Sequence, residues 1–324
     1  MTKGAAMSSG PSTRPTTGAV EHDPEGGLGT IGAPADRELR PEQRPRRSAP
    51  PPSRPPRFAL TRRVGRGTVT FLRETGNIVD FAIEGGRATF RRPVAWGPAL
   101  AEQMVAVLRL CWIPMIISTM AFGLGAPGLQ GGNLVSLFGV PDRLGGFFVM
   151  ASIREFAPWI NAMVVAGVVG SAITADLGAR RIREEVDAME VLGVDPMREL
   201  VVPRVLALTI MTGLLNVLAL VFGIVGGFIA SVPILGASAG GFLTSFWTNA
   251  TVIDLVGSMM KTTAFGFLIG VVCCYKGLHA KGGPAGVGRA VNQAVVISFM
   301  AIWIVNYIFT STMLGLFPEA VVTR

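Results

Sequence analysis

Long stretches without a charged residue constrain this 324-residue chain more than any other feature of its sequence. The twenty residues from Phe156 to Ala175 carry no charge, and none occurs from Val205 to Thr251 either. Each run is long enough for a helix to cross the hydrocarbon core of a bilayer, which is roughly 30 Å thick. Half of all residues are hydrophobic and only 15% are charged, which is too apolar for a soluble globule with a wetted surface. The sequence therefore predicts an integral membrane protein.

The apolar runs predict an all-α fold with five transmembrane helices. The expected spans cover about residues 104–124, 155–175, 205–231, 252–275 and 290–316. Basic residues cluster before the first span, between the second and third, and between the fourth and fifth. By the positive-inside rule we expect a multi-pass protein of the plasma membrane, with a cytoplasmic N-terminus and an extracytoplasmic C-terminus. The glycine-rich segment 125–152 fits either an outer loop or a segment partly within the membrane.

Residues 1–60 form a basic, proline-rich tail that is predicted to be disordered. Eleven prolines occur in residues 1–57, with almost no apolar clusters to bury. Twelve basic and six acidic residues between Met1 and Arg66 make the approach to the membrane basic. Because aromatic residues do not alternate with these charges and a membrane span follows, we expect anionic headgroups, and no nucleic acid, as the partner. We expect no signal peptide, since the first long apolar run begins near Ala99.

Residues 61–98 are predicted to form an interfacial amphipathic helix and an elbow, before a five-span domain of residues 99–324. Between Thr68 and Glu84, apolar residues recur on one helical face and polar residues on the other. A helix with this pattern lies in the plane of the membrane surface and does not cross it. Two glycines and Pro93 then interrupt the chain before the first span.

A charged segment, Asp176–Arg204, separates the second and third predicted spans and carries five basic and seven acidic residues. Within it, Arg180–Leu192 is predicted to be a short cytoplasmic helix, because Ile182, Val186 and Met189 recur at helical spacing on one face. A glycine and a proline follow and end this helix. Three pairs of opposite charge also have i,i+4 spacing, each in the weaker order with the base N-terminal to the acid: Arg180–Glu184, Arg181–Glu185 and Arg183–Asp187.

Two interpretations of this segment are open. Its charges suit an ordinary cytoplasmic loop that they keep in water. Its amphipathic helix also suits insertion into a groove on a soluble partner, as in helix-in-groove recognition. The coupling helices of ABC transporters act in this second way.

Two parts of the chain resemble the MlaE/YrbE family, the permeases of Mla- and Mce-type lipid ABC transporters. The first part is REFAPWINAMVVAGVVGSAITADLGARRIREEVDAMEVLGVDPMRELVVPR, from Arg154 to Arg204. The second is VVCCYKGLHAKGGPAGVGRAVNQAVV, from Val271 to Val296, which resembles the actinobacterial YrbE (A-type) subunit of Mce systems. The resemblance covers roughly residues 62–318 and rests on a motif tens of residues long, placed between the second and third spans.

The resemblance implies the permease subunit of an ATP-driven Mce-type transporter, which moves fatty acid, mycolate-type or sterol lipid across the envelope, with import as the expected direction. The chain itself is then no enzyme and binds no cofactor, because a separate ATPase subunit holds ATP and Mg²⁺. The other implied partners are a second MlaE/YrbE-type permease, expected to be a paralogue, extracytoplasmic MCE-domain proteins, and the lipid.

The alternative function is an ATP-independent secondary transporter or a membrane scaffold. Ion-coupled carriers usually place ionisable residues near the membrane midplane. The predicted spans are nearly free of charge apart from Lys261 and the edge residue Arg109, which favours the ATP-driven lipid transporter. We expect Lys261 to pair with a helix end or with Asp254, or to snorkel to the interface, and we expect Arg109 to snorkel as well.

The candidate site residues form two groups. The resembled family implies five ATPase-coupling residues, of which the acidic ones face the ATPase: Glu184, Glu185, Val186, Asp187 and Met189. Small residues at a spacing of four predict close helix packing in the second and third spans. They are Ala166, Gly167, Gly170, Ser171, Gly223 and Gly227.

Catalytic and metal-binding motifs are missing from the sequence. It contains no phosphate-binding loop, no G-x-S-x-G elbow and no H-E-x-x-H sequence. His22 and His279 have no other metal ligands close to them in sequence, so no metal site is expected. Cys111, Cys273 and Cys274 lie in apolar segments and are expected to be small buried side chains.

Overall fold

A computed structural model describes residues 58–90 and 97–316, and these residues are helical apart from short connections. They all belong to one compact unit of the chain, Arg57–Arg324. Most of the predicted tail, and the predicted elbow around Pro93, lie outside the described residues.

The elements α1 to α11 are joined directly, by short connections, or by 3-10 and π-helical turns, labelled η. In chain order they are α1 (Phe58–Phe90), α2 (Gly97–Gly123), η1 (Leu124–Gln130), α3 (Gly131–Leu137), η2 (Pro141–Arg143), α4 (Leu144–Phe148), η3 (Val149–Phe156), α5 (Ala157–Val165), η4 (Ala166–Gly170), α6 (Ser171–Ile182), α7 (Glu185–Val191), η5 (Met197–Val201), α8 (Val202–Ile229), η6 (Ala230–Ile234), α9 (Ala239–Asn249), α10 (Val252–Leu278) and α11 (Gly283–Leu316).

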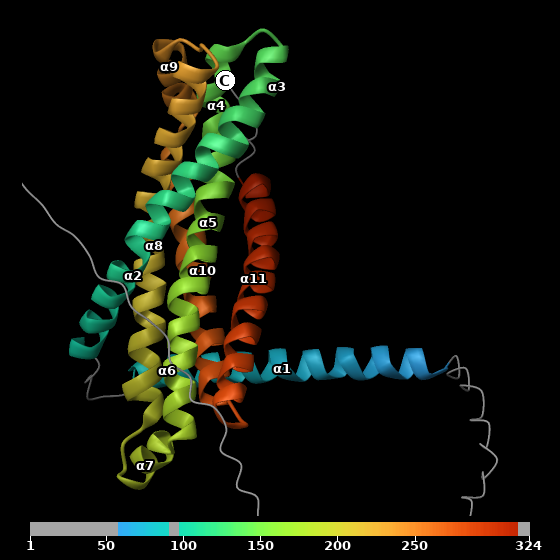
Figure 1. The fold of residues 1–324 in the computed structure, drawn as a ribbon, viewed down its shortest axis with the longest axis vertical. Coiled ribbons are helices and arrows are strands. Elements are labelled where there is room, and N and C mark those ends of the chain that lie inside the picture. The colour runs from blue at the N-terminus through green and yellow to red at the C-terminus, as the bar shows by residue number, and fades with distance from the viewer. Residues whose placement is uncertain (1–57, 91–96, 317–324) are drawn as a thin grey trace, which may run out of the picture. The chain divides into compact units, whose positions relative to one another are not determined.

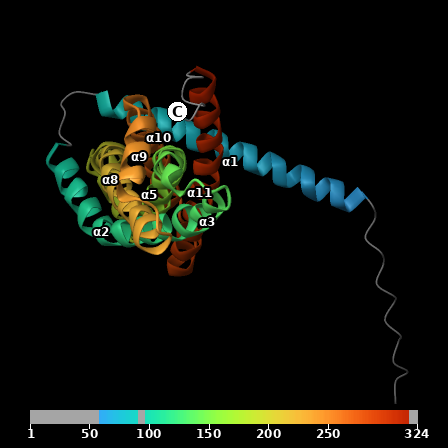
Figure 2. The same ribbon diagram turned by 90° about the horizontal axis from the view of Figure 1, so that it is seen from above.

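Five helical segments in the described part of the chain are long and apolar enough to cross a membrane. They run from Gly97 to Leu137, Pro141 to Ile182, Met197 to Ile234, Val252 to Leu278 and Gly283 to Leu316. The predicted number of spans is confirmed, although each segment is longer than predicted. The long helices run side by side (Figure 1), and a view along them places α2 and α11 on opposite flanks of α5, α8 and α10 (Figure 2).

Glycine and proline in segment 125–152 do not end the first long helix. The backbone passes through the π-helical turn η1, which contains Pro127, and continues as α3 to Leu137. A short connection around Gly139, whose φ is +72°, then leads into the second segment. Pro233 is held in the same way by the π-helical turn η6. Such local changes of hydrogen bonding accommodate a residue without an N–H in a membrane helix, so this segment is helical almost throughout.

Close approach of α2 to α8 forms part of the core. A Cβ atom on Gly123 would lie 2.2 Å from the carbonyl oxygen of Gly223, and a Cβ atom on Gly226 would lie 2.3 Å from that of Met120. These distances are too short for any side chain, so the contact requires glycine. Gly266 allows α10 to approach α8 as closely, with 2.4 Å between its added Cβ and an α8 carbonyl oxygen.

The residues that were predicted to pack closely lie in different surroundings. A Cβ atom on Gly227 would lie 1.9 Å from the ring of Phe148, and one on Gly170 would lie 2.8 Å from Sγ of Cys273 in α10. Gly167, in contrast, has open space beside it, with no atom within 4 Å of an added Cβ. The other three are Ala166 and Gly223, both buried, and Ser171, which donates a hydrogen bond to a carbonyl oxygen of its own helix.

Replacing Gly170 by leucine is expected to lower the melting temperature of the purified chain in detergent. The new side chain would meet Cys273 and Ile269, with its Cβ at 2.8 and 3.3 Å from them, so the second segment must move away from α10. Overpacking of this kind costs about 1–3 kcal/mol. Gly167→Leu is the matched control, because its side chain would enter open space in the same turn η4. Equal melting temperatures of the two variants would contradict the packing of Gly170 against α10.

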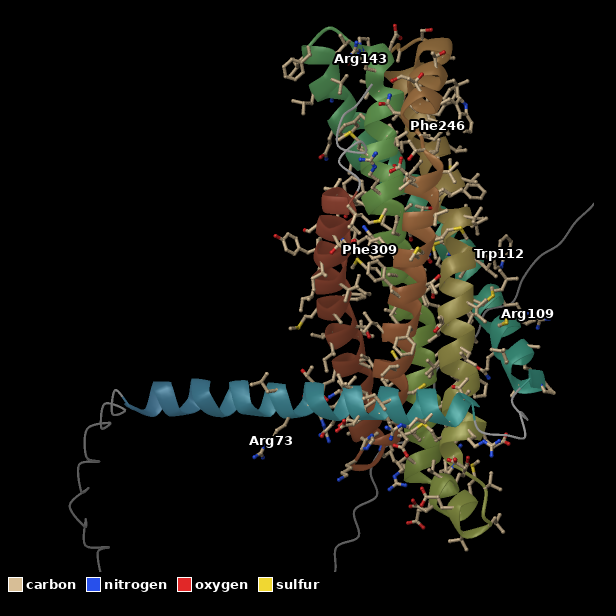
Figure 3. The ribbon with its side chains drawn as sticks, turned by 180° about the vertical axis from the view of Figure 1, so that it is seen from behind. Arg73, Arg109, Trp112, Arg143, Phe246 and Phe309 are labelled. Carbon is tan, nitrogen blue, oxygen red and sulfur yellow. The ribbon has the colours of Figure 1, made fainter. Side chains whose placement is uncertain are left out.

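Helix α1 lies across the long helices, near the end of the bundle that carries α7 (Figures 1 and 3). Phe81 is buried, with its ring centroid 5.6 Å from that of Tyr275, and Glu74 forms an ion pair with Lys276. Among the described side chains of α1, Leu72, Val79 and Ile83 are exposed instead. Exposed apolar residues on a helix that crosses the spans suit the membrane surface, and the interfacial position of α1 stays a prediction.

Candidate functional site

The charged segment 176–204 extends beyond the other long helices as a helical hairpin, which we call the charged hairpin (Figure 1). The prediction of one continuous helix over Arg180–Leu192 is wrong, because α6 and α7 are separate helices. The break falls at Glu184, whose φ of +60° is the left-handed conformation that residues other than glycine rarely adopt. Beyond this bend Val186 reaches the core of the chain and is only 4% exposed, so burial of its side chain stabilises the bent backbone.

The bend also changes the ion pairs of the charged hairpin. None of the three i,i+4 pairs with the base N-terminal to the acid forms between the described side chains, since helical spacing is lost at Glu184. Other pairs form instead: Arg180 with Asp176, Arg183 with Glu185, and Arg181 with Asp187. The hydrogen bond to Glu185 is the main cause of the raised pKa of the Arg183 guanidinium. Because these pairs are exposed, they contribute little to stability.

Arg204 fixes the base of the charged hairpin. Its Nη2 atom lies 2.7 Å from Oδ2 of Asp176, and its Nη1 atom lies 2.7 Å from the carbonyl oxygen of Leu200. Arg204 is buried, so this ion pair is better shielded than those at the tip, and it joins the start of α8 to α6. Sequence spacing did not indicate this contact, because 28 residues separate the two side chains.

The five predicted coupling residues divide into outward-facing acids and inward-facing apolar side chains. Glu184 and Asp187 are exposed, and Glu185 is partly exposed. Val186 is buried and Met189 is partly buried, and both pack against the core of this chain. The two apolar side chains therefore hold α7 in place, while the three acids face the surroundings.

A different pair of apolar side chains lies at the tip of α7. Val191 and Leu192 are 88% and 79% exposed, so they do not pack within the described chain. Gly193, with a φ of +76°, then turns the backbone toward α8. Helical periodicity in the sequence indicated Val186 and Met189 as the apolar contacts. The exposure of Val191 and Leu192 was not predicted, because the sequence did not indicate the bend at Glu184. Packing within the described chain does not explain why these apolar side chains are exposed next to outward-facing acids.

A second group of charged residues lies between η3 and α10, and we call it the charge cluster: Arg154, Glu155, Asp254 and Lys261. Nε of Arg154 is 2.7 Å from Oδ1 of Asp254. Nζ of Lys261 is 3.2 Å from Oε1 of Glu155 and 2.7 Å from the carbonyl oxygen of Arg154. Lys261 is only 2% exposed and Asp254 5%. Each charge has a partner of opposite sign, as burial within a membrane segment requires.

The structure decides between the alternatives that the sequence left for Lys261. Its ammonium group bonds to Glu155 and to a carbonyl oxygen of η3, and Asp254 pairs with Arg154. Of the three alternatives, pairing with Asp254 does not occur, because that carboxylate is held between Arg154 and the cap of its own helix, where Thr251 donates a hydrogen bond to it.

Helix α11 completes the charge cluster. Thr310 Oγ1 donates to Oε1 of Glu155 at 2.7 Å, and Asn306 Nδ2 donates to Oε2 at 2.8 Å. With Lys261, these groups give the carboxylate three donors from two helices. A small cavity of about 40 Å³ adjoins the cluster, and its wall includes Phe309 (Figure 3) and Met313. The cluster thus ties the second, fourth and fifth segments together beside an apolar space.

The prediction of nearly charge-free spans was wrong at this point. All four residues of the charge cluster lie within the second and fourth membrane-spanning segments. Arg154 and Glu155 stood at the edge of the predicted span, but α4 and η3 extend the helix beyond them. Arg109 is exposed on the outer face of α2, where snorkelling stays a prediction (Figure 3).

The cysteines are buried, as predicted, and all three are free thiols. Across residues 58–90 and 97–316, no group of three or more His, Cys, Asp or Glu side chains is placed to hold a metal ion.

Five apolar helical segments around a shared core define this chain as a multi-pass membrane protein. The match to a family model described as Permease MlaE extends over residues 100–312 and so includes most of all five segments. The chain belongs to the MlaE permease family.

Relatives from bacteria and a plant share this similarity. A probable ABC transporter permease protein of Rickettsia typhi is 30% identical over 247 residues, which cover 76% of this chain and 95% of the relative. The intermembrane phospholipid transport system permease protein MlaE of Haemophilus influenzae is 25% identical over 256 residues, covering 78% and 96%. The chloroplast protein TRIGALACTOSYLDIACYLGLYCEROL 1 of Arabidopsis thaliana is 34% identical over 173 residues, which are 53% of this chain and 49% of that protein.

Proposed function

We propose that this chain is the permease subunit of an ABC-type transporter that moves lipid across the cell envelope. The observation that carries the proposal is the charged hairpin, an exposed acidic and apolar surface on a membrane bundle of the MlaE family. Relatives named as ABC transporter permeases support it. ATP hydrolysis then belongs to a separate ATPase subunit that holds ATP and Mg²⁺, while this chain supplies the membrane path and no catalytic residue.

In this proposal the charged hairpin is the ATPase docking site. Glu184, Glu185 and Asp187 would meet a basic rim on the ATPase, and Val191 and Leu192 would enter its groove. Val186 and Met189 have a supporting role, because they pack inward and set the direction of α7. The ion pair of Arg204 with Asp176 gives the hairpin a fixed base, through which movement of the ATPase would reach α6 and α8.

The proposed cargo is a hydrophobic lipid. One relative is named for phospholipid transport, and this supports a lipid over a water-soluble cargo. The likeness of residues 154–204 and 271–296 to Mce-associated permeases favours fatty acid, mycolate-type or sterol lipid, moved inward. The same likeness favours a second YrbE-type permease, as a paralogue, and extracytoplasmic MCE-domain proteins as further partners.

The charge cluster gives the secondary-transporter alternative a specific observation in its favour. Ionisable groups within spans can carry protons, as Glu155 or Asp254 would have to do here. However, each of these carboxylates forms an ion pair and accepts hydrogen bonds within the charge cluster. A structural role, in which the cluster holds the helices together, is therefore the better interpretation.

A lipid-transport assay in proteoliposomes distinguishes the ABC-type transporter from the secondary transporter. The full chain, reconstituted with its ATPase and partner permease, is expected to transfer fluorescent fatty acid or sterol only when ATP is added. A protonophore should leave the rate unchanged. Transfer without ATP that the protonophore abolishes would replace the ABC-type proposal with the secondary transporter.

Membrane topology provides a separate prediction. With five spans and positive-inside orientation, a reporter fused after Arg324 should be extracytoplasmic, and one inserted at Gly282 cytoplasmic. Alkaline phosphatase and green fluorescent protein fusions report the two sides. A cytoplasmic reporter at the C-terminus would contradict both the orientation and the assignment of the charged hairpin to the ATPase side.

A further inference from the structure

A polar cavity lies where α1, α10 and α11 meet, away from the charge cluster. Its volume is about 280 Å³, which is large enough for a glycerophosphate group. Three cationic side chains line it, namely Lys276, Lys281 and Arg289, together with His279 and one acid, Glu74. We call this space the basic cavity.

The basic cavity has more positive charge than its own acid neutralises. Lys276 is 8% exposed, forms an ion pair with Glu74, and donates a 3.1 Å hydrogen bond to Gln293. Glu74 is therefore already paired. Lys281 and Arg289 are exposed, and no acidic side chain among the described residues pairs with them. Two positive charges thus face the cavity without compensation.

The backbone adds to this positive field. Gly282 and Gly283, with φ of +89° and +67°, turn the chain between α10 and α11. Gly286, in the first turn of the 34-residue helix α11, lines the cavity. The start of a helix carries partial positive charge from its free N–H groups, so it supports the lysine and arginine beside it in attracting an anion.

The basic cavity lies where the fourth segment ends and the fifth begins, a place that we expect to be at the membrane surface. The connection between the fourth and fifth segments forms one wall, and α1, with its exposed apolar side chains, forms another. In a five-span chain this connection lies on the same side as the charged hairpin. Basic pockets between membrane helices at such a surface suit the headgroups of anionic lipids.

We propose that the basic cavity binds the phosphate group of an anionic membrane phospholipid, which joins α1 to the α10–α11 connection as a bound lipid that is not transported. Lys281 and Arg289 contact the phosphate, while Lys276 and Glu74 form the floor. This inference goes beyond the transport function and does not depend on the identity of the cargo.

Native mass spectrometry of the full chain tests this proposal with phosphatidylglycerol and phosphatidylcholine as probes. The wild type is expected to retain phosphatidylglycerol on the order of tenfold better than phosphatidylcholine, and Lys281→Gln with Arg289→Gln should abolish that preference. Arg73→Gln with Arg87→Gln is the matched control, because both arginines are exposed on α1 outside the cavity lining, and Arg73 projects into open space (Figure 3). The control should keep the preference within about twofold of the wild type.

Three results would overturn the proposal. The first is equal retention of the two lipids by the wild type. The second is an equal loss of the preference for phosphatidylglycerol in the cavity variant and the control, which would mean that the lipid is attracted to the basic surface in general. The third is displacement of phosphatidylglycerol by millimolar inorganic phosphate, which would assign the cavity to a free anion. If the double variant does not fold, Lys281→Gln is compared with Arg73→Gln in the same way, with the melting temperature as the check on folding.

Discussion

Replacing Glu155 by leucine is expected to lower the free energy of unfolding by about 3 kcal/mol. Lys261, 2% exposed, would lose the one carboxylate that pairs with it among the described residues, and Asn306 and Thr310 would lose their acceptor. Removing one member of a buried ion pair costs about 3–5 kcal/mol, and the lower value applies because the Glu155 side chain is 34% exposed. Reversible unfolding in mixed detergent and SDS micelles measures the change.

The double variant Glu155→Leu with Lys261→Met separates this explanation from a general packing defect. Replacing both charges by apolar groups of similar size is often nearly neutral, so we expect the double variant to regain most of the lost stability. A double variant that is as unstable as the sum of the single variants would show that the two charges do not interact. Stability of Glu155→Leu within 0.5 kcal/mol of the wild type, about the scatter of surface substitutions, would contradict the buried pair.

Charge reversal at the tip of the charged hairpin is expected to have the largest effect on function. Glu184→Lys with Asp187→Lys should weaken ATPase binding on the order of a hundredfold and abolish lipid transport, because repulsion replaces attraction at the proposed contact. Both side chains are exposed, so membrane insertion and the melting temperature should not change. Glu84→Lys with Glu102→Lys, the same change of charge at exposed sites on α1 and α2, is the matched control and should bind and transport normally.

The fold was largely predictable because hydrophobicity alone defines membrane spans. Charge-free runs and the positions of basic residues indicated five spanning helices, and the number is confirmed. Their ends were not predictable, since Pro127 and Pro233 are breakers in soluble helices but fit within π-helical turns here. The π-helical turn η3, which contains no proline, extended the second segment past Arg154 and Glu155 and so brought charges into the bundle.

The candidate site was predictable in location but not in detail. Its charge content marked residues 176–204, yet the bend at Glu184 depends on burial of Val186 in a core formed by distant residues. The ion pairs that i,i+4 spacing along one helix would allow therefore do not form. The apolar residues predicted from helical spacing, Val186 and Met189, face the core of this chain. The contact of Glu155 with Lys261 joins residues 106 positions apart, and no local pattern indicates such a contact.

Affinity purification of the full chain from its native membrane, with quantification of bound ABC-type ATPase, tests the central claim most directly. We predict that the wild type and the Glu84→Lys, Glu102→Lys control retain one ATPase per permease, and that the Glu184→Lys, Asp187→Lys variant retains none while inserting at the same level. Absence of an ATPase from the wild type, or its full retention by the hairpin variant, would contradict the claim that the charged hairpin couples this permease to ATP hydrolysis.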